Sequence, residues 1–514
     1  MISNAWPKTV LRITCCTIML LLLVSILLPG SAKSDKEAFF TSIGEFYTPG
    51  IRLGVQTGSS YDLFCREQFP LSDISYFTSY PDMIQQVRQG ALDGFLTSEV
   101  TARELINDVD GITYLPEQLD ELDICMALAK NDTGLRLQAQ LNAFIARAKE
   151  DGTLQAVTEA WLMDDTEHQV TDFETLEPVN GTIRLATESA YPPYDFVRSG
   201  SIVGIDIDLL TRFCREEGYG LEIMDMSFDA LIPSLGTRSD IVANGITYSD
   251  ERAEKVLFTV PYSAEKTVMI VRCPMEKTDF FTSLKNSFVS TFIKESRWQL
   301  LLEGLGTTMC ISLLSGVLGT LLGFGICMLR RGKNRFCIAL TTGYIRLLQG
   351  TPIVVLLLIL YYVIFTDASV SGLTVAVAAF TMNFAAYVSE MMRTGIDAVP
   401  AGQMEAALAM GYTRRSAFFR IVMPQAALHF LPVYKGEVVS LIKSTSVVGY
   451  IAVQDLTKMS DIIRSRTYDA LFPLITTAAI YFAVAALLGH LVSHIEIRLK
   501  PDRAHRGVKG VKML

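Results

Sequence analysis

Several common features are missing from this sequence. No glycine in its 514 residues is followed at the required distance by Gly-Lys-Ser/Thr, so the chain lacks a Walker-type phosphate loop. The net charge of −9 is spread over both halves, which predicts no nucleic-acid partner. Residues 38–303 contain no close cysteine pair and no metal-like cysteine spacing. We therefore expect no P-loop nucleotide hydrolysis, no metal site and no cofactor bound by this chain.

The cysteines of that region are Cys65, Cys125, Cys214 and Cys273. Buried free thiols are the favoured interpretation, and a disulfide remains open.

The composition indicates a chain that is partly water-soluble and partly embedded in a membrane. Half of its residues are hydrophobic and 19% are charged, which is too apolar for a soluble enzyme. Lys8 and Arg12 precede the apolar run Cys16–Leu28, which ends in small residues suited to cleavage. Because this run is short for a membrane span, residues 1–33 are predicted to be a signal peptide, with cleavage left open.

Residues 38–272 alternate short β-rich runs with helical stretches, a pattern typical of α/β layers around a mostly parallel sheet. Ile51–Val55 is a predicted strand that leads into the polar turn Gln56–Ser60 and then a helix. Such a junction directs free backbone N–H groups at whatever lies above it, so it suits a carboxylate or other polar ligand group. A second predicted strand starts at Thr182 and opens another unit of this kind.

Four segments of the second unit follow that strand in a specific order and spacing: Thr187–Phe196, Gly204–Leu210, Phe228–Pro233 and Asp240–Arg252. Together they resemble the first lobe of the periplasmic substrate-binding proteins for polar amino acids. The earlier stretch, Gly54–Trp161, resembles the second lobe of the same family. The resemblance implies a two-lobed α/β fold of the periplasmic-binding-protein type with the lobes in reversed, circularly permuted order. Two half-domains, each completed by another chain, are the alternative.

The implied boundaries are 38–163 for the second lobe with its closing helices, 164–181 for a linker, 182–272 for the first lobe and 273–303 for a second linker.

The resemblance also implies a site for an amino acid. Arg252 stands where the family places its carboxylate-binding arginine, and its planar fork suits two parallel hydrogen bonds. Thr247 would add a hydroxyl, and Gly245 would let backbone approach the ligand. Tyr191, Tyr194 and Phe228 match the aromatic residues over and under the ligand, with ordinary core packing as the alternative. On the other lobe, ligand-contacting turn positions are matched by Gln56, Ser59 and Ser60.

One position departs from the family pattern. The acidic residue expected to hold the ligand's ammonium group is replaced by Ser98, and Glu99 follows one place later. Three alternatives remain: Glu99 substitutes, or backbone carbonyls and Glu188 hold the ammonium, or the ligand is not an ordinary α-amino acid.

The second half of the chain is predicted to be an all-α membrane domain over 304–496, with a basic tail over 497–514. The five expected spans are Gly304–Leu329, Leu347–Phe365, Ala368–Ser389, Val438–Val453 and Ala470–Ile495. Arg330, Arg331, Lys333 and Arg335 follow the first span and place its end in the cytoplasm, so the α/β part is expected outside. Lys458, Arg464 and Arg466 are exceptions to this charge rule, because they fall in an outer turn.

Residues 405–424 form a polar segment within this apolar half. Glu405, Ala406, Ala407, Gly411 and Pro424 resemble, in identity and spacing, the EAA loop with which ABC importer permeases bind their ATPase. Residues 346–352 and 387–403 also resemble amino-acid permeases. A helix over Met404–Met410, a turn at Gly411 and a second helix over Ser416–Val422 are predicted, with Pro424 as a breaker.

These resemblances imply the binding and membrane subunit of an ATP-driven importer of polar amino acids. The expected partners are an amino acid, a separate ABC ATPase that uses the ATP, a second permease copy and membrane lipid. The expected location is the plasma (inner) membrane of a bacterium. The alternatives are an amino-acid-gated ion channel and a membrane sensor. Ser446–Tyr450 has some likeness to a potassium filter, but Ile451 stands where the second filter glycine belongs.

Overall fold

The computed structural model describes residues 39–163, 166–198, 200–274, 280–365 and 370–499. The elements below belong to the compact unit formed by the described residues from 42 onward. The predicted signal peptide and the tail from residue 500 lie outside the described residues. So do residues 164–165 and 275–279 of the two predicted linkers.

The first sheet of the α/β part has the strand order β2-β1-β3-β14-β4, and β5 pairs with β14. Its strands are β1 (Arg52–Gln56), β2 (Asp73–Phe77), β3 (Gly94–Ser98), β4 (Ile112–Tyr114), β5 (Asp120–Ile124) and β14 (Ser263–Arg272). The helical elements of this region are η1 (Ile43–Tyr47), α2 (Tyr61–Gln68), α3 (Tyr80–Arg88) and α4 (Glu99–Asp108). Because β1 is parallel to both β2 and β3, the turns after these strands lie at one edge of the sheet.

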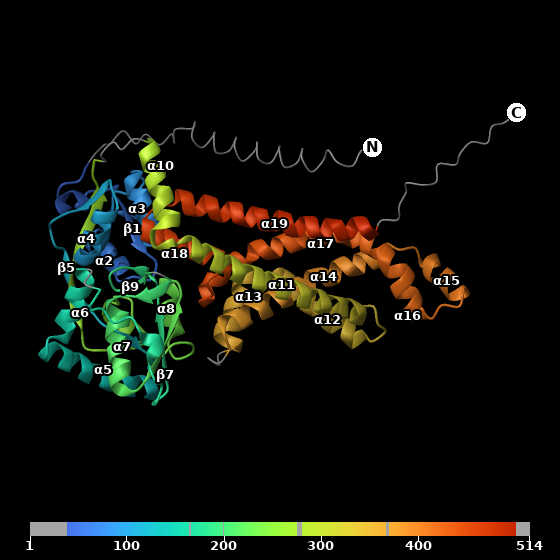
Figure 1. Cartoon of the computed structure of the whole chain (residues 1–514), viewed down its shortest axis with the longest axis horizontal. Helices are drawn as coiled ribbons and strands as arrows, with labels where there is room; N and C mark the ends of the chain where they lie inside the picture. Colours follow the sequence, from blue (N-terminus) through green and yellow to red (C-terminus); the bar gives the residue numbers. More distant parts are fainter. Residues whose placement is uncertain (1–38, 164–165, 199, 275–279, 366–369, 500–514) are drawn as a thin grey trace. The chain divides into compact units, whose positions relative to one another are not determined.

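The second sheet has the strand order β11-β7-β12-β6-β13. Its strands are β6 (Ala127–Leu128), β7 (Thr182–Thr187), β11 (Gly220–Asp225), β12 (Ile241–Val242) and β13 (Leu257–Phe258), and β8 (Ala190–Tyr191), β9 (Asp195–Arg198) and β10 (Ser201–Val203) form a small antiparallel sheet. The helical elements are α5 (Asp132–Glu150), α6 (Thr153–Leu162), η2 (Phe173–Thr175), α7 (Ile205–Glu217), α8 (Phe228–Ser234) and α9 (Asp250–Ala253). Helices α5, α6 and α7 pack with this sheet through one apolar core (Figure 1).

The two lobes exchange strands. β6 and the helices α5 and α6 follow the first sheet in sequence, yet they belong to the second sheet and its core. β14 follows the second sheet in sequence and pairs with β3, β4 and β5 of the first. Residues 263–272 were expected in the first-lobe segment 182–272, and the structure places them in the sheet of the other lobe. The two segments therefore complete each other within one chain.

The helical half contains three helices long and apolar enough to cross a membrane, and up to five spans if each of two bent helix pairs counts as one, among the residues the structure describes. The helical elements are α10 (Phe280–Phe288), η3 (Val289–Ile293), η4 (Lys294–Ser296), α11 (Trp298–Arg330), α12 (Arg335–Gly350), α13 (Ile353–Ile359), η5 (Leu360–Ile364), α14 (Gly372–Asp397), α17 (Met423–Ser444), η7 (Thr445–Ile451), α18 (Leu456–Thr467) and α19 (Leu471–Leu499). The bends are 110° between α12 and α13 and 57° before α18.

Two predicted spans differ from the structure. The predicted span Leu347–Phe365 is broken at Thr351 and Pro352, because proline has no N–H to continue the helix and restricts the residue before it. The predicted span Val438–Val453 covers only the end of a longer helical segment. That segment starts with α17 at Met423 and ends in the tighter 3-10 turns of η7.

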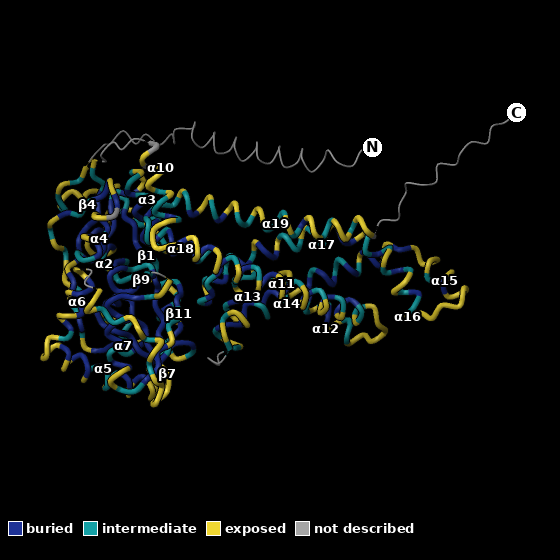
Figure 2. Tube along the Cα trace, in the orientation of Figure 1, coloured by how far each residue is buried: buried dark blue, intermediate teal, exposed yellow. Residues whose placement is uncertain are grey.

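Close packing of α11 on α14 relies on glycine. A Cβ added at Gly323 would lie 2.8 Å from the carbonyl oxygen of Ala385, and one at Gly319 would lie 2.9 Å from Phe384. Small residues let two membrane helices approach this closely. Figure 2 shows buried positions along both helices where they face neighbouring elements.

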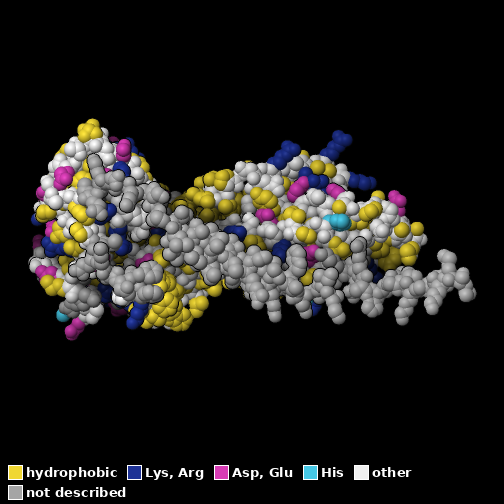
Figure 3. Space-filling view, turned by 90° about the horizontal axis from the view of Figure 1, so that it is seen from above, with side chains coloured by type: hydrophobic (Ala, Val, Ile, Leu, Met, Phe, Trp, Pro, Cys, Tyr) yellow, Lys and Arg dark blue, Asp and Glu magenta, His cyan; other side chains and the backbone are white. Residues whose placement is uncertain are grey.

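Large apolar side chains are exposed on the outer helices. On α11, Val317 is 61% exposed and Leu321 is 65% exposed, and on α19 Leu487 is 58% exposed. Figure 3 shows patches of hydrophobic side chains over the helical half, together with some charged ones, and charged side chains mixed across the α/β half. Such a surface is costly in water and suits lipid.

The segment 405–424 forms a helix, a turn and a second helix. α15 spans Ala401–Ala409, Gly411 adopts a φ of +86°, and α16 (Arg414–Ala417) continues through the π-helix η6 (Phe418–Val422) into α17. The helix-turn-helix is as predicted. The prediction that Pro424 breaks the helix is wrong, because Pro424 lies in the first turn of α17 just after the π-helix. A local widening of the helix accommodates the missing N–H of proline without ending the helix.

Candidate functional site

A small cavity of about 30 Å³ lies where the two lobes meet. It is lined by Gln56, Ser59, Ser60, Tyr61, Tyr80, Leu122, Ile124, Tyr191, Phe228, Asn244, Gly245, Thr247 and Glu265. Seven predicted site residues are among them: Gln56, Ser59, Ser60, Tyr191, Phe228, Gly245 and Thr247. A space of this size holds about two water molecules, so an amino acid enters only after the lobes separate.

Arg252 joins the two lobes beside this cavity. Its guanidinium donates to the carbonyl oxygen of Thr247 at 2.9 Å and to that of Gly58 at 2.7 Å, so it connects the lobe of β12 to the β1–α2 turn. Thr247 Oγ1 makes a second bridge by donating to Ser60 Oγ at 2.6 Å. Burial lowers the pKa of Arg252 from its ordinary value. The partners of this partly desolvated guanidinium are neutral oxygens. Its hydrogen bonds would become stronger if a carboxylate replaced them.

The predicted aromatic residues divide into two kinds. Tyr191 lines the cavity and lies between two rings, stacked on Tyr194 at 5.6 Å and on Tyr80 at 5.5 Å between centroids. Tyr194 is 1% exposed and packs in the core of its lobe, with its hydroxyl donating to Glu265. Tyr194 therefore supports Tyr191 rather than facing the cavity.

Gly245 has a packing role that the sequence did not indicate. A Cβ there would lie 2.8 Å from the ring of Tyr191, and the residue has a φ of +55°. Its N–H donates to Asp206 Oδ2 at 2.9 Å. Glycine is thus required for the tyrosine stack and the backbone conformation, in addition to any approach by a ligand.

Glu265 is the acidic residue of the cavity, and sequence reasoning missed it. It lies in β14, and its Oε2 atom is buried and has no hydrogen-bond partner among the described residues. Burial raises its pKa to about 7. An unpartnered carboxylate oxygen in an aromatic cavity can accept hydrogen bonds from an ammonium group. The only sequence signal was an acidic residue within a strand, which is too weak to single out.

None of the three residues considered for the ammonium group, Ser98, Glu99 and Glu188, is part of the cavity lining. Ser98 caps α4 by accepting from the N–H of Thr101 at 3.2 Å, and Glu99 pairs with Arg103 at 2.6 Å on the surface of that helix. Glu188 is buried at the lobe interface and accepts from Gln56 Nε2 at 3.0 Å. Burial raises the pKa of Glu188 to about 7.

A second polar cavity of about 390 Å³ lies within the helical half, next to the α12–α13 bend. Its polar lining comes from Gln349 and Thr351 at the bend, Asn383 on α14, and Glu437 and Ser440 on α17. The bend therefore places polar groups inside a helical domain that is otherwise apolar, as in the interior of transport proteins.

The turn between α15 and α16 presents apolar side chains to its surroundings. Ala407 is buried and holds the turn to the helices, whereas Glu405 and Ala406 are exposed. Met410 is 77% exposed, and Leu408 and Tyr412 are also exposed. Exposed apolar clusters of this kind are typical of surfaces that contact another protein or a membrane.

Comparisons with known proteins agree with both halves. Residues 183–412 match the bacterial extracellular solute-binding proteins, family 3. The octopine transport system permease protein OccM of Rhizobium radiobacter is 34% identical over 213 residues, which are 40% of this chain and 87% of that protein. The arginine transport system permease protein ArtQ of Bacillus subtilis (strain 168) is 31% identical over 204 residues, 39% of this chain and 93% of that protein.

A solved structure, described as an amino acid ABC transporter with histidines, is 32% identical; it covers 43% of this chain and 100% of its own, with a TM-score of 0.37. The permease relatives are matched over most of their length, and the solute-binding match begins in β7. The chain therefore belongs to the family of amino-acid ABC transport system permeases, and it carries a solute-binding domain on the same polypeptide.

Proposed function

We propose that this chain captures a polar amino acid outside a bacterial plasma membrane and carries it across in one ATP-driven importer. The observation that carries the proposal is a cavity between two lobes that combines an adjoining arginine, stacked tyrosines and an unpartnered carboxylate oxygen, on the same chain as a permease domain. No finding supports the ion-channel alternative.

The cavity suits the two charged ends of an amino acid. Arg252 would exchange its carbonyl partners for the ligand carboxylate, because charge-assisted paired bonds are stronger than neutral ones. Glu265 would accept the ammonium group, and Tyr191 and Phe228 would contact the side chain. The relatives named for octopine and arginine transport support a polar amino acid or a derivative as the substrate class.

The membrane arrangement we propose has five spans with the binding domain on the outer face. Arg330 and Arg331 end α11 and form ion pairs with Glu390 and Asp397 near the end of α14. This basic end would be cytoplasmic by the charge rule. The α15–α16 turn would lie on the same side and bind the ATPase, which supplies the nucleotide chemistry that this chain's sequence lacks. Two permease copies and two ATPases would form the complete transporter, with lipid against α11 and α19.

The experiment is ligand binding by the full chain in lipid nanodiscs, with an amino-acid panel as the probe and thermal stabilisation as the readout. We expect at least one polar amino acid to stabilise the protein, and Arg252→Ala to abolish that stabilisation. Arg66→Ala is the matched control, because Arg66 is exposed on α2 and pairs with Asp62 away from the cavity. Full stabilisation of the Arg252→Ala variant would refute the site.

A further inference from the structure

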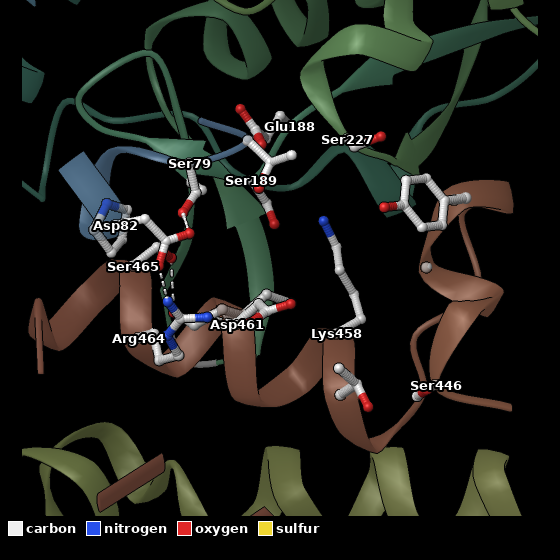
Figure 4. A pocket seen from close by; sticks show the side chains of 17 residues that line it. Ser79, Asp82, Glu188, Ser189, Ser227, Ser446, Lys458, Asp461, Arg464 and Ser465 are labelled. Atoms are coloured by element: carbon white, nitrogen blue, oxygen red, sulfur yellow. Dashed lines mark hydrogen bonds and ion pairs between the residues drawn. The ribbon is translucent and has the colours of Figure 1, made fainter. Parts of the chain in front are cut away.

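The small cavity between the two lobes, of about 30 Å³, is the cleft of the binding domain. A larger cavity, of about 260 Å³, lies next to this cleft, on the side of the membrane helices. Asp82 lines it from one lobe, and Glu188 and Ser227 line it from the other. Ser446, Lys458 and Arg464 line it from η7 and α18 of the helical half. Figure 4 shows Lys458 extending from α18 into this space toward Ser189 and Ser227. Both binding lobes and the helical half therefore contribute to the wall of this cavity.

The lining of this cavity adjoins the lining of the cleft at two places. Glu188 lines the larger cavity and accepts the hydrogen bond of Gln56, which lines the cleft. Ser227 lines the larger cavity, and the next residue, Phe228, lines the cleft. A ligand released from the cleft toward the membrane thus meets this space next.

Arg464 and Lys458, two cations that line the cavity, differ in their ion-pair partners. Arg464 is held by Asp82 and by Asp461, at 2.8 Å from the latter, so its charge is balanced locally (Figure 4). Lys458 Nζ lies 3.2 Å from Asp225 Oδ1, and this ammonium group has three donors to offer. Ser227 Oγ is buried and has no hydrogen-bond partner in the part of the chain that the structure describes.

Asp225 has partners besides the lysine. Its two oxygens accept from the N–H of Ser189 at 3.0 Å and from Ser189 Oγ at 2.8 Å. The carboxylate therefore remains hydrogen-bonded when the lysine turns to another anion. Lys458 is the cation of the cavity with donors to spare.

We propose that this cavity is a transit site for a zwitterionic amino acid between the cleft and the membrane path, with Lys458 holding its carboxylate and Glu188 its ammonium group. The inference rests on the proposed function, because it needs an amino acid that leaves the cleft. The site uses groups from both halves of the chain, so it is assembled only when the binding domain is docked. The larger volume of this cavity relative to the closed cleft gives the released ligand a place to go before the membrane path opens.

The test uses the complex of the full chain with its ATPase in proteoliposomes, and a mixture of the twenty radiolabelled L-amino acids as the probe. Binding of the same mixture to the complex without ATP reports the cleft. Lys458→Met is expected to lower ATP-driven uptake by about tenfold or more while binding stays within about twofold of wild type. Lys458→Arg keeps the charge and should retain most of the uptake.

Asp225→Asn separates transit from simple docking. If Lys458 serves only to pair with Asp225, this variant loses uptake as Lys458→Met does, and the transit site is refuted. If the lysine serves the ligand, Asp225→Asn keeps most of the uptake. Ser227→Trp fills the cavity and should block uptake with binding retained, whereas Ser227→Ala should not.

Uptake by Lys458→Met equal to that of wild type would also overturn the transit site, and the importer function would stand. A wild-type complex without ATP-driven uptake would instead overturn the proposed function, and the transit site with it.

Discussion

At the scale of single residues, Glu265 is the group whose role is easiest to isolate. Glu265→Gln keeps the shape of the side chain and removes the charge that the carboxylate carries above its pKa of about 7, so the ligand's ammonium group loses its ionic partner. We expect the Kd to rise by about tenfold or more, as for the loss of a charge-assisted bond. Calorimetry on the full chain in nanodiscs measures it. The control is Glu121→Gln, an exposed carboxylate on neighbouring β5. Equal affinities for both variants would remove Glu265 from the site.

The same carboxyl group predicts a pH dependence of stability. Its pKa is about 7 in the folded chain, against an ordinary value of 4.5. The folded state then keeps a proton that the unfolded chain releases between these values, so stability falls as the pH rises from about 4.5 to 7. The slope from this one group is at most about 1.4 kcal/mol per pH unit. Thermal unfolding of the full chain at pH 5, 6 and 7 should show a shallower slope for Glu265→Gln, and an unchanged slope would contradict the buried, protonated state.

Sequence spacing predicted seven of the residues that line the cavity. The lining residues that it did not predict were missed for a physical reason. Gln56 ends β1, Tyr191 ends β8 and Thr247 follows β12, so each lies in a segment that the motifs predicted. Glu265 and Tyr80 reach the same cavity from β14 and α3, at positions for which the sequence offered no site motif. Their contribution depends on how the lobes meet, which local patterns do not encode. The roles of Arg252 and Glu188 as ligand contacts remain predictions.

At the scale of elements, the α11–α14 contact makes a sharp prediction. Gly323→Ala would place a methyl group 2.8 Å from the carbonyl oxygen of Ala385, so the helices must move apart. We expect a loss of about 1–3 kcal/mol, typical of overpacking, seen as a lower unfolding temperature in nanodiscs. Gly325→Ala is the control two residues away on α11, because nothing lies within 4 Å of its added Cβ. Equal unfolding temperatures for the two variants would contradict the close approach.

A second prediction concerns the contact between the α8–β12 loop and the end of η5. Arg238 is buried, donates to the carbonyl oxygen of Tyr361 at 2.8 Å and to that of Val370 at 2.9 Å, and lies 3.9 Å from the ring centroid of Tyr361. Arg238→Met would remove these hydrogen bonds from a contact in which the arginine is buried, at a cost of about 2 kcal/mol or more. The unfolding temperature of the full chain should fall. Arg215→Met, on the surface pair with Asp172, is the control and should change little.

Element boundaries show where sequence patterns succeed and fail. The helix-turn-helix around Gly411 was predictable, because spacing and a glycine with positive φ determine it locally. The continuation of α17 through Pro424 was not, since a π-helix offsets the missing N–H. The exchange of β6 and β14 between lobes was also missed. β6 has only two residues, and β14 comes directly after the first-lobe motifs in the sequence. The sequence of neither strand therefore indicates which sheet the strand joins.

At the scale of the whole molecule, a solute-binding domain and a permease domain lie on one polypeptide. Gly411 lets the α15–α16 turn present Met410 and Tyr412, and its φ of +86° is one that other residues rarely adopt. Gly411→Val should weaken ATPase binding about tenfold or more while ligand binding stays unchanged, because the cleft is far from this turn in sequence and belongs to other elements. Copurification of the ATPase with each variant measures it, and Gly402→Ala on α15 is the control. Undiminished ATPase binding would remove the turn from the coupling surface.

The most direct test of the account is uptake of radiolabelled amino acids by proteoliposomes that contain the chain and its ATPase. The account predicts accumulation that requires ATP on the side of the membrane where the ATPase is bound, disappears with Arg252→Ala and persists with Arg66→Ala. Accumulation without ATP, or a ligand-gated ion current in place of accumulation, would contradict it.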